Sequence, residues 1–593
     1  MNSKLIPLAA AILVAVPVFA QSTILVPDPT VSIQGAIVAA ANGDTILVGA
    51  GTWTEQLDFL GKAIHVKGLG PSLTTIDAQN QGSVVRFSSG EQSNSILEGI
   101  RLTGGRGDYF TEAGASQHSG GGIVITGSFY GSATPICSPT IIDVLVDGCF
   151  GNAGAGIFVW GASHAHLIDC RVVGSTRVDP LGLVSYSYGG EGILVERNAY
   201  VTMTGGEISQ SDGAGYGGLD CSTPSLIEDV LISLNFGGGI CTEGSQHVIR
   251  RCRIWGNFSL YQGGGICLAN GGPSFLSSPV LIEDCVIEGN YAPFAGGAIA
   301  GQSFVNIAVS NCTIVGNVAP MNAALYTISF AAADIRNSIV RGNGPAPLYV
   351  TPTGLGGLTI RNSNVEFGAS GPGNVDVDPR FVDVGSHDYR LAHDSPMIDA
   401  GDDSLASTGG LDRGGLPRIL NGTVDIGAHE SNDIANHAAA AGTVSDPSSG
   451  APFRTLRVNG DDGGDDYRVE VPAFAPWSLS FTSPPWLTPH PDFALFGAVA
   501  EATIQTVVNV PLGIGEMAFL PCPLAPQFEG PIFTLASTVP LPCSVVLPAA
   551  PAATWSTPAI VGLPAPLDLS FQGVILDATG QLDVTNLVIV RIR

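Results

Sequence analysis

The stretch Cys252-Arg253-Ile254-Trp255-Gly256-Asn257 decides the fold, because close copies of it follow along the chain. The copies read Cys285-Val286-Ile287-Glu288-Gly289-Asn290, Cys312-Thr313-Ile314-Val315-Gly316-Asn317 and, more weakly, Ser338-Ile339-Val340-Arg341-Gly342-Asn343. Their first residues are separated by 33, 27 and 26 positions. Self-similarity at such a period indicates that the chain stacks one structural unit on itself.

A second phrase lies between these copies. It reads Gly120-Gly121-Gly122-Ile123, Gly189-Gly190-Glu191-Gly192-Ile193, Gly237-Gly238-Gly239-Ile240, Gly263-Gly264-Gly265-Ile266 and Gly296-Gly297-Ala298-Ile299. Each repeat therefore holds at least two short β-type segments separated by turn residues. No segment has a sustained 3.6-residue apolar period, and a repeat of about 25 residues suits one turn of a parallel β-helix. We predict an all-β fold, a right-handed parallel β-helix.

The repeat can be aligned along the chain at the position of Cys285. The aligned residues are Ile64, Ile100, Val144, Cys170, Gly206, Val230, Cys252, Cys285, Cys312, Ser338 and Ser363. Side-chain alternation then directs Cys285 and Ile287 inward and Val286 and Glu288 outward. We interpret the cysteines of this column as small buried residues rather than a metal or redox site, because neither a CxxC spacing nor an inward histidine accompanies them.

Asparagines recur at one turn position of five consecutive repeats. They are Asn235, Asn257, Asn290, Asn317 and Asn343. Stacked amides can hydrogen-bond to one another and to the backbone of the turn, so we predict a structural ladder rather than a catalytic group.

The acidic composition disfavours two classes of partner. The net charge of the 593 residues is −27, and 13% of them are charged. An acidic protein has no general attraction for phosphate backbones, so we expect no nucleic-acid partner. The charge also disfavours an anionic polysaccharide unless a basic patch or bound cations intervene. Eleven cysteines are an odd number, so at least one must stay free or pair between chains.

The N-terminus has the features of a secretory signal peptide over residues 1–20. Lys4 is the basic residue, an apolar stretch runs from Leu5 to Val16, and Val18-Phe19-Ala20 is a small-residue cleavage site. No other run of about 18 apolar residues follows, so we expect a soluble mature protein that is secreted or displayed at the cell surface.

Two segments resemble known families. The first is carried by Ile33-Gln34-Gly35-Ala36-Ile37, Gly43-Asp44-Thr45-Ile46-Leu47-Val48, Gly51-Thr52-Trp53-Thr54-Glu55 and Lys62-Ala63-Ile64-His65-Val66-Lys67-Gly68. It resembles the N-terminal segment of pectin-lyase-like β-helix proteins, in which the first phrase implies a short helix that caps the coil. Apolar residues at positions 33, 37 and 40 or 41 suit an amphipathic cap, which a terminal coil needs to cover its strand edges.

The second resemblance lies at the end of the repeats. The matching blocks are Asp378-Pro379-Arg380-Phe381, Tyr389-Arg390-Leu391, Ser395-Pro396-Met397-Ile398-Asp399-Ala400-Gly401 and Val424-Asp425-Ile426-Gly427-Ala428-His429-Glu430. They are similar to the closing segment called a choice-of-anchor domain in bacterial surface β-helix proteins. This similarity implies an exported or surface-displayed protein and implies no reaction.

These features divide the chain into five parts. We predict a signal peptide (1–20), a capped β-helix (21–375), a closing segment (376–430), a linker (431–452) rich in Ala, Ser, Asn and Pro, and a C-terminal domain (453–593). Alternating strands separated by prolines predict that the last part is a small antiparallel β-sandwich. Cys522 and Cys543 are its cysteines and are candidates for a disulfide.

Catalytic motifs are hard to place on this chain. We find neither the arginine-bearing motifs of pectate lyases, nor the Asn-x-Asp and Gly-His-Gly phrases of polygalacturonases in the repeats, nor the site of pectinesterases. Arg250 should lie between Glu228 and Glu283, and Arg251 between two aspartates, Asp229 and Asp284, so both arginines should be neutralised by neighbouring turns. Arg253 and Trp255, with Glu288 as the nearest partner, remain the candidate ligand-binding residues.

Metal sites are equally weak candidates. His164 and His166 could point outward together but lack a third ligand, so we expect a solvated pair and no metal site. Calcium is the one cofactor that the acids of the closing segment could bind, although turn caps explain them equally well. These acids are Asp399, Asp402, Asp403, Asp412, Asp425 and Glu430.

The sequence favours a non-enzymatic β-helix protein whose outer face binds glycans or other components of the cell envelope. The main alternative is a polysaccharide lyase or glycoside hydrolase acting on an acidic polysaccharide, with its site on the inserted loops 104–119, 175–188 or 270–279. A third interpretation is a structural stalk that displays the C-terminal domain.

Overall fold

The computed structural model describes most of the chain up to residue 431 and the strands beyond it. The described ranges are 21–112, 115–127, 135–177, 192–213, 217–244, 246–269, 279–344, 347–350, 357–392, 395–420, 423–431 and the strands between 456 and 592. The predicted signal peptide, most of loops 175–188 and 270–279, and both Cys522 and Cys543 lie outside these ranges. No helix among the described residues is long and apolar enough to cross a membrane.

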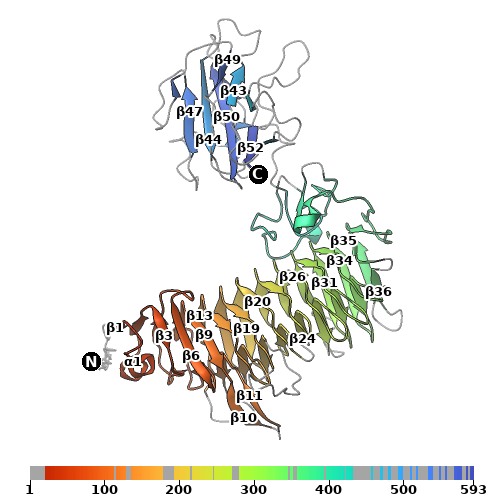
Figure 1. Cartoon of the computed structure of the whole chain (residues 1–593). Helices are drawn as coiled ribbons and strands as arrows, with labels where there is room; N and C mark the ends of the chain where they lie inside the picture. The colour runs from red at the N-terminus through yellow and green to blue at the C-terminus, as the bar shows by residue number, and fades with distance from the viewer. Residues whose placement is uncertain are drawn as a thin grey trace, which may run out of the picture. The chain divides into compact units, whose positions relative to one another are not determined.

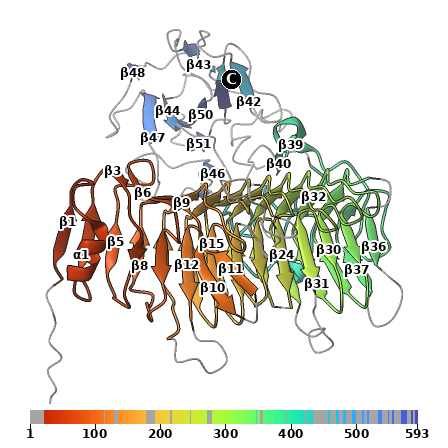
Figure 2. The same cartoon turned by 60° about the horizontal axis from the view of Figure 1, so that its bottom comes forward.

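The repeats form a right-handed parallel β-helix, as predicted. Figure 1 and Figure 2 show the chain winding in successive turns, with each strand beside its counterpart from the turn before. Each full turn contributes one strand to each of three long parallel sheets, which we name A, B and C. Parallel pairing satisfies the backbone of every internal turn, and the apolar faces of the three sheets meet inside the coil.

The strands of each sheet follow one another in chain order. Sheet A contains β1 (Thr23–Val26), β2 (Thr45–Val48), β5 (His65–Lys67), β8 (Ile96–Glu98), β13 (Thr140–Ile142), β16 (His164–Ile168), β19 (Tyr200–Thr204), β22 (Leu226–Glu228), β25 (Val248–Arg250), β28 (Val280–Glu283), β31 (Asn306–Ser310), β34 (Ala332–Arg336) and β37 (Leu358–Arg361). Sheet B contains β3 (Gly51–Trp53), β6 (Thr74–Gln81), β9 (Arg101–Gly105), β14 (Leu145–Asp147), β17 (Arg171–Val173), β20 (Glu207–Ser209), β23 (Leu231–Ser233), β26 (Arg253–Trp255), β29 (Val286–Glu288), β32 (Thr313–Val315), β35 (Ile339–Arg341) and β38 (Asn364–Val365). Sheet C contains β4 (Leu57–Asp58), β7 (Val85–Phe87), β12 (Ile123–Thr126), β15 (Ile157–Trp160), β18 (Ile193–Glu196), β21 (Leu219–Cys221), β24 (Ile240–Glu243), β27 (Ile266–Ala269), β30 (Ile299–Gly301), β33 (Leu325–Thr327) and β36 (Leu348–Val350).

The predicted alignment of the repeats holds from Ile100 to Ser363. The pairings of sheet B place each of these residues directly before a strand that is in register with the next. The assignment of Ile64 is wrong, because Ile64 precedes a strand of sheet A and the residue in register with the Ile100 position is Thr74, the first residue of β6 in sheet B. A long turn between β5 and β6 separates the two positions, so the apolar start of β5 imitates the repeat.

The column of cysteines lies inside the coil, as predicted. Cys252 and Cys285 are fully buried, and the backbone N–H of Cys252 donates to the Sγ of Cys285 at 3.4 Å. Further along, the N–H of Cys312 donates to the Oγ of Ser338 at 3.0 Å. At Cys285 and Ser338 the side chain at this position accepts a hydrogen bond from the previous turn, a role that both cysteine and serine can fill.

The asparagine ladder is confirmed and is continuous. The backbone N–H and the Nδ2 of Asn257 both donate to the Oδ1 of Asn290, at 3.0 and 2.9 Å, and Nδ2 also donates to the carbonyl of Ile232. The amides from Asn235 to Asn343 repeat this linkage from turn to turn. The phrase rich in glycine faces the ladder, since a Cβ on Gly265 would lie 3.1 Å from the amide nitrogen of Asn290.

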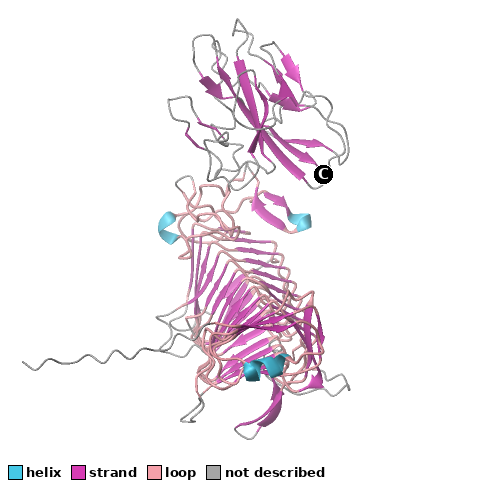
Figure 3. Ribbon diagram, turned by 90° about the vertical axis from the view of Figure 1, so that its left-hand side faces the viewer, coloured by secondary structure: helices cyan, strands magenta, loops and turns pink. Residues whose placement is uncertain are grey.

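The N-terminal cap is the helix α1 (Ile33–Ala39), which covers the first turn of the coil (Figure 3). Ile33, Ala36 and Ile37 are buried, as the predicted amphipathic pattern requires. The hydroxyl of Ser32 accepts from the N–H of Gly35 at the start of the helix. At its end, the Nζ of Lys62 donates to three backbone carbonyls, those of residues 37, 38 and 40, each at 2.7 Å.

The candidate loop 104–119 contains an antiparallel hairpin of β10 (Asp108–Glu112) and β11 (Ala115–Ser119). The whole chain divides into two compact units, the first of which contains the coil. The first contains residues 1–377, 401–418 and 426–428, and the second contains 378–400, 419–425 and 429–593. The predicted closing segment 376–430 is thus shared between the units, and the proposed domain boundaries stay a prediction.

The second unit is described by its strands. It holds the two-stranded antiparallel pair of β39 (Phe381–Asp383) and β40 (Asp388–Leu391), joined by the 3-10 helix η2 (Val384–Ser386). Its other strands pair mainly antiparallel, with parallel exceptions at β42–β52 and β47–β48. They are β41 (Leu456–Val458), β42 (Arg468–Val471), β43 (Leu479–Thr482), β44 (Asp492–Ala498), β45 (Val508–Asn509), β46 (Glu516–Met517), β47 (Ile532–Ser537), β48 (Leu547–Pro548), β49 (Thr554–Ser556), β50 (Leu567–Leu576), β51 (Leu582–Val584) and β52 (Val588–Ile592).

Candidate functional site

The three residues predicted to bind a ligand lie together on the outer face of sheet B. Trp255 of β26 is in register with Glu288 of β29. The Nε and Nη2 of Arg253 lie 2.7 and 2.6 Å from the Oε1 of Glu288, and the guanidinium carbon lies 5.7 Å from the centre of the Trp255 ring. The side chain of Glu288 is only 2% exposed, and its buried carboxylate forms an ion pair with Arg253. Ligand binding by these residues stays a prediction.

The adjacent arginines are paired with the carboxylates of one neighbouring turn. The Nε of Arg250 donates to Glu228 at 2.9 Å, and the Nε of Arg251 donates to Asp229 at 3.0 Å. Burial alone would raise the pKa of Glu228, but hydrogen bonds from both arginines lower it. Half of the predicted arrangement is therefore confirmed by direct contacts.

The carboxylates of the other neighbouring turn contact residues 401–418, which we call the strap. The Oγ1 of Thr408 lies 2.9 Å from Glu283, and the Oγ of Ser407 donates to Asp284 at 2.9 Å. Arg418 contributes a third contact, with its Nη1 3.0 Å from the Oδ1 of Asp284. The strap includes the 3-10 helix η3 (Asp403–Leu405). It therefore contacts Glu283 and Asp284, the two acids that the sequence analysis paired with the adjacent arginines.

The strap follows a column of turn residues that adopt positive φ between sheets A and B. Its Asp402 backbone exchanges two hydrogen bonds with the amide of Asn337, both at 3.0 Å. The N–H of Ser407 then donates to Asn311, and its hydroxyl to Asp284. The strap thus crosses these turns in reverse chain order, and another stretch of the first unit, at Ala428, contacts Thr313 on the outer face of sheet B. The predicted outward residues Val286 and Glu288 on the same sheet are buried as well.

The acids of the closing segment accept hydrogen bonds from backbone N–H groups. Asp402 accepts from Ser404, and Asp412 from Leu416. In the second unit, Asp425 accepts from Asp399 and itself donates its N–H to Glu430. Within the ranges described above, no group of three or more His, Cys, Asp or Glu side chains is arranged to hold a metal ion.

The two histidines lie on the outer face of sheet A. The ring of His164 lies 3.7 Å from that of His166 and stacks on Tyr200 at 3.7 Å, while its Nε2 lies 2.9 Å from the hydroxyl of Thr202. Burial, with a smaller effect of His166, lowers the pKa of His164 to about 4. Both rings are thus held neutral, with His164 tilted against His166 and stacked on Tyr200, and they are less solvated than the sequence indicated.

A cavity of about 220 Å³ lies where sheet B turns into sheet C, and we call it the notch. Its lining residues are Gly237, Gly238, Ile240, Cys241, Ser259, Tyr261, Gln262, Gly263, Cys267 and Gln302. The notch arises because two successive turns differ in length. The turn from Asn235 to Ile240 is shorter than the turn from Asn257 to Ile266 on the next coil, so the longer turn projects beyond the shorter one.

The outer face of sheet C below the notch carries an acid and two thiols in one column. Asp220, Cys241 and Cys267 are in register on the consecutive strands β21, β24 and β27. Asp220 is 7% exposed, and its burial, reinforced by Glu196 and Glu243, raises its pKa well above the ordinary value. This region therefore favours neutral or protonated groups and opposes a bound carboxylate.

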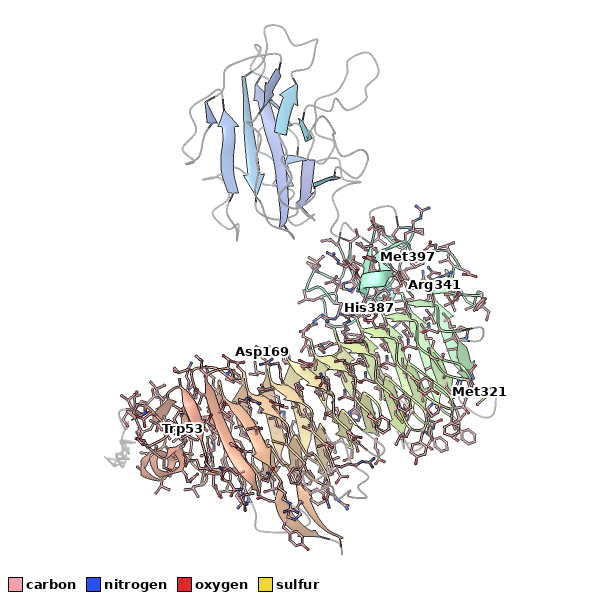
Figure 4. The ribbon with its side chains drawn as sticks, in the orientation of Figure 1. Trp53, Asp169, Met321, Arg341, His387 and Met397 are labelled. Carbon is pink, nitrogen blue, oxygen red and sulfur yellow. The ribbon has the colours of Figure 1, made fainter. Side chains whose placement is uncertain are left out.

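Apolar side chains are exposed along the same corner over four turns, and we call them the ridge. They are Phe236, Phe258, Tyr261, Tyr291, Phe294, Val318 and Met321, with Met321 labelled in Figure 4 at the edge of the coil. The rings of Phe236, Phe258 and Tyr291 stack face to face with centroids 5.2 and 4.9 Å apart, so they present mainly their edges. Tyr261 and Phe294 are more available, with 62% and 58% exposure.

Comparison with known proteins supports the fold. Residues 140–338 match the family described as the right-handed beta helix region. No curated protein matches the chain. The class that fold and comparison define is a right-handed parallel β-helix protein, and its activity has to be argued from its surface.

Two features of the sequence indicate the notch, although neither is a known motif. Cysteine follows the glycine-rich phrase in two consecutive repeats, at Cys241 and Cys267, and strand alternation directs both outward. The shorter spacing between Asn235 and Ile240 was also visible. The strap could not be anticipated in the same way, because its partners are up to 134 residues away.

Proposed function

We propose that this protein is an exported, non-enzymatic β-helix module that binds a glycan at the notch. The observation that carries the proposal is the notch itself. The ridge adds two exposed aromatic rings, those of Tyr261 and Phe294. Its volume is below the ~300–1,000 Å³ of pockets that enclose drug-sized ligands, so it suits a single sugar ring. The signal-peptide features of residues 1–20 and the resemblance to surface β-helix proteins support an extracellular or cell-surface location.

The chemistry of the lining suits a sugar. Tyr261 offers an aromatic face with a polar end, and the side chains of Gln262 and Gln302 offer donors and acceptors. Burial and the nearby charges of Glu196 and Glu243, which together raise the pKa of Asp220, also disfavour the carboxylate of a uronic acid. The proposed ligand is therefore a neutral glycan of an extracellular polysaccharide or of the cell envelope, rather than an acidic one.

A glycan array probed with the full chain tests this proposal. We expect binding to neutral polysaccharides without release of products, and Tyr261→Ala should weaken it about tenfold, equivalent to ~1.4 kcal/mol. Tyr109→Ala is the matched control, because Tyr109 is about as exposed as Tyr261, at 60% against 62%, but lies on β10 of the hairpin. Equal loss in both variants, or binding only to acidic polymers, would contradict the proposal.

A glycoside hydrolase is the second candidate, because Asp220 is a buried carboxylic acid whose raised pKa suits a general acid. Glu243 or Glu196 would then act as the second carboxylate. Reducing-end assays on the glycans that bind distinguish the two functions. Product release that Asp220→Asn abolishes, while binding persists, would establish the hydrolase.

A further inference from the structure

Two cysteines differ from those of the inner column because their side chains point out of the coil. Cys241 and Cys267 are directly paired across the parallel strands β24 and β27, and both line the notch. The strand alternation that directs Ile240 and Ile266 into the core directs these thiols out of it. They therefore form a pair on the outer face of sheet C.

The inward thiols are chemically protected. The Sγ of Cys252 donates to the carbonyl of Ile227 at 3.5 Å, and that of Cys312 to the carbonyl of Ile282 at 3.4 Å. Burial raises the pKa of Cys170 to about 12, so its thiolate is scarce near neutral pH. Thiolates are the nucleophiles in sulfur chemistry, and these cysteines should be inert.

The outward pair has the opposite character. A hydrogen bond between the two thiols lowers the pKa of Cys267 and raises that of Cys241, so that Cys267 is the better thiolate and Cys241 the proton donor. Cys267 is also the more accessible of the two, since Cys241 is 4% exposed and Cys267 is half-buried. Nucleophilic attack should therefore begin at Cys267.

The geometry of the sheet allows the two sulfurs to join. Neighbouring strands lie about 4.7–4.9 Å apart, and a disulfide spans Cα atoms separated by about 4.4–6.8 Å. Three of the residues that line the notch beside the pair are glycines, Gly237, Gly238 and Gly263, which leave a small reagent room to approach.

From these observations we infer that Cys241 and Cys267 are a reactive dithiol that a small disulfide compound oxidises to a bond between adjacent turns. The Cys267 thiolate attacks one sulfur of the small disulfide and forms a mixed disulfide, and the first small thiolate leaves. Cys241 then attacks the sulfur of Cys267, its proton passes to the second departing thiolate, and the Cys241–Cys267 bond forms. Two protein thiols are oxidised, and one small disulfide is reduced to two thiols.

Incubation of the reduced full chain with oxidised glutathione tests this inference. After native alkylation and digestion, we expect mass spectrometry to find the peptides of Cys241 and Cys267 joined with the loss of two hydrogen atoms. The cysteines of the inner column should be modified only after denaturation. A stable glutathione adduct on Cys267 without the cross-link, an unmodified pair, or equally fast reaction of inner cysteines would overturn the inference.

Two variants separate the steps, and a third is the control. Cys241→Ser should trap glutathione on Cys267, because the resolving thiol is gone, whereas Cys267→Ser should leave Cys241 largely unmodified. Cys252→Ser, which changes an inward thiol, should leave the yield of the Cys241–Cys267 cross-link unchanged. Mapping of the wild-type chain decides the matter even if a variant folds poorly, and none of these results depends on glycan binding.

Discussion

The carboxylate of Asp284 accepts a hydrogen bond of 3.0 Å from the guanidinium of Arg418, which lies 134 residues further along the chain. Both side chains are almost completely buried, at 0% and 2% exposure. Burial raises the pKa of Asp284 to about 7, although Arg418 and Ser407 oppose this effect. The pair joins the strap to the turns of the coil, so the strap is an integral part of the first unit.

Removal of Arg418 should strongly destabilise the first unit. We expect Arg418→Ala to lower the free energy of unfolding by about 3–5 kcal/mol, because Asp284 would be left as a buried group without its cation. Denaturant titration of the full chain measures this loss. Arg390→Ala is the control, since Arg390 pairs with Asp388 but is 64% exposed, and should cost about 0–1 kcal/mol.

The pair can also be replaced as a unit. A double variant, Arg418→Met with Asp284→Asn, should recover part of the stability lost in Arg418→Ala, because it removes the uncompensated charge while asparagine tolerates the positive φ of position 284. If Arg418→Ala alone costs no more than Arg390→Ala, the strap does not depend on this contact.

The asparagine ladder should be more sensitive than its exposed counterparts. In Asn290→Ala, the N–H and Nδ2 of Asn257 lose their shared acceptor, and the carbonyl of Ile254 loses a donor. Each buried group left without a partner costs about 1–3 kcal/mol, so we expect a total loss of at least ~2 kcal/mol. Thermal unfolding should show a clear decrease in Tm for this variant.

Asn94→Ala provides the comparison for the ladder, because Asn94 is exposed on the same coil. Its effect should stay within about 0.5 kcal/mol. A similar decrease in Tm for both variants would mean that the stacked amides fill space without contributing hydrogen bonds to stability.

Local periodicity predicted the coil because every turn repeats the same requirements. The ladder from Asn235 to Asn343 and the column from Cys252 to Ser363 follow from one residue being stacked on its counterpart. Irregular features escaped prediction for the corresponding reason. Ile64 was misplaced because the turn after β5 interrupts the period, and the notch arises where one turn is shorter than the next.

The site was harder to predict than the fold. Sequence alternation brought Arg253, Trp255 and Glu288 together and gave Glu288 as the nearest partner of Arg253, but it could not show that the side chain of Glu288 is almost completely buried. It also could not place the strap over Glu283 and Asp284, because contacts of such large sequence separation have no repeat to indicate them. Outward position in a strand is therefore a weaker guide to exposure than inward position is to burial.

The neighbouring rings of His164 and His166 give the stability of the fold a pH dependence whose sign can be derived. The pKa of His164 is about 4 in the folded protein and about 6.5 in an unfolded chain, so the unfolded state binds more protons between these values. Stability should consequently fall as the pH decreases from about 6.5 toward 4, by on the order of 1 kcal/mol after allowance for solvent screening. NMR titration of the imidazole protons measures the pKa directly.

A variant assigns this effect to the ring pair. His164→Gln should reduce the loss of stability over the same pH range, because it removes the group that must be protonated on unfolding. An imidazole of His164 that titrates near 6.5 in the folded chain would contradict the neutral, stacked arrangement.

Lys62 should hold the end of the N-terminal cap. Its ammonium group donates to the carbonyls of Ile37, Val38 and Ala40, which have few other partners at the C-terminus of α1. Lys62→Met removes these charge-assisted bonds while it keeps most of the side-chain volume, and we expect a local loss of about 1.5–3 kcal/mol. Hydrogen exchange of the amides in residues 33–40 should accelerate, whereas that of the central turns should not change.

Lys67→Met is the control for the cap. It removes an ion pair with Glu98 at a side chain that is 44% exposed, and should leave exchange in the cap unaffected. Faster exchange in both variants would show that the first turns of the coil, rather than the contacts of Lys62, limit the stability of the cap.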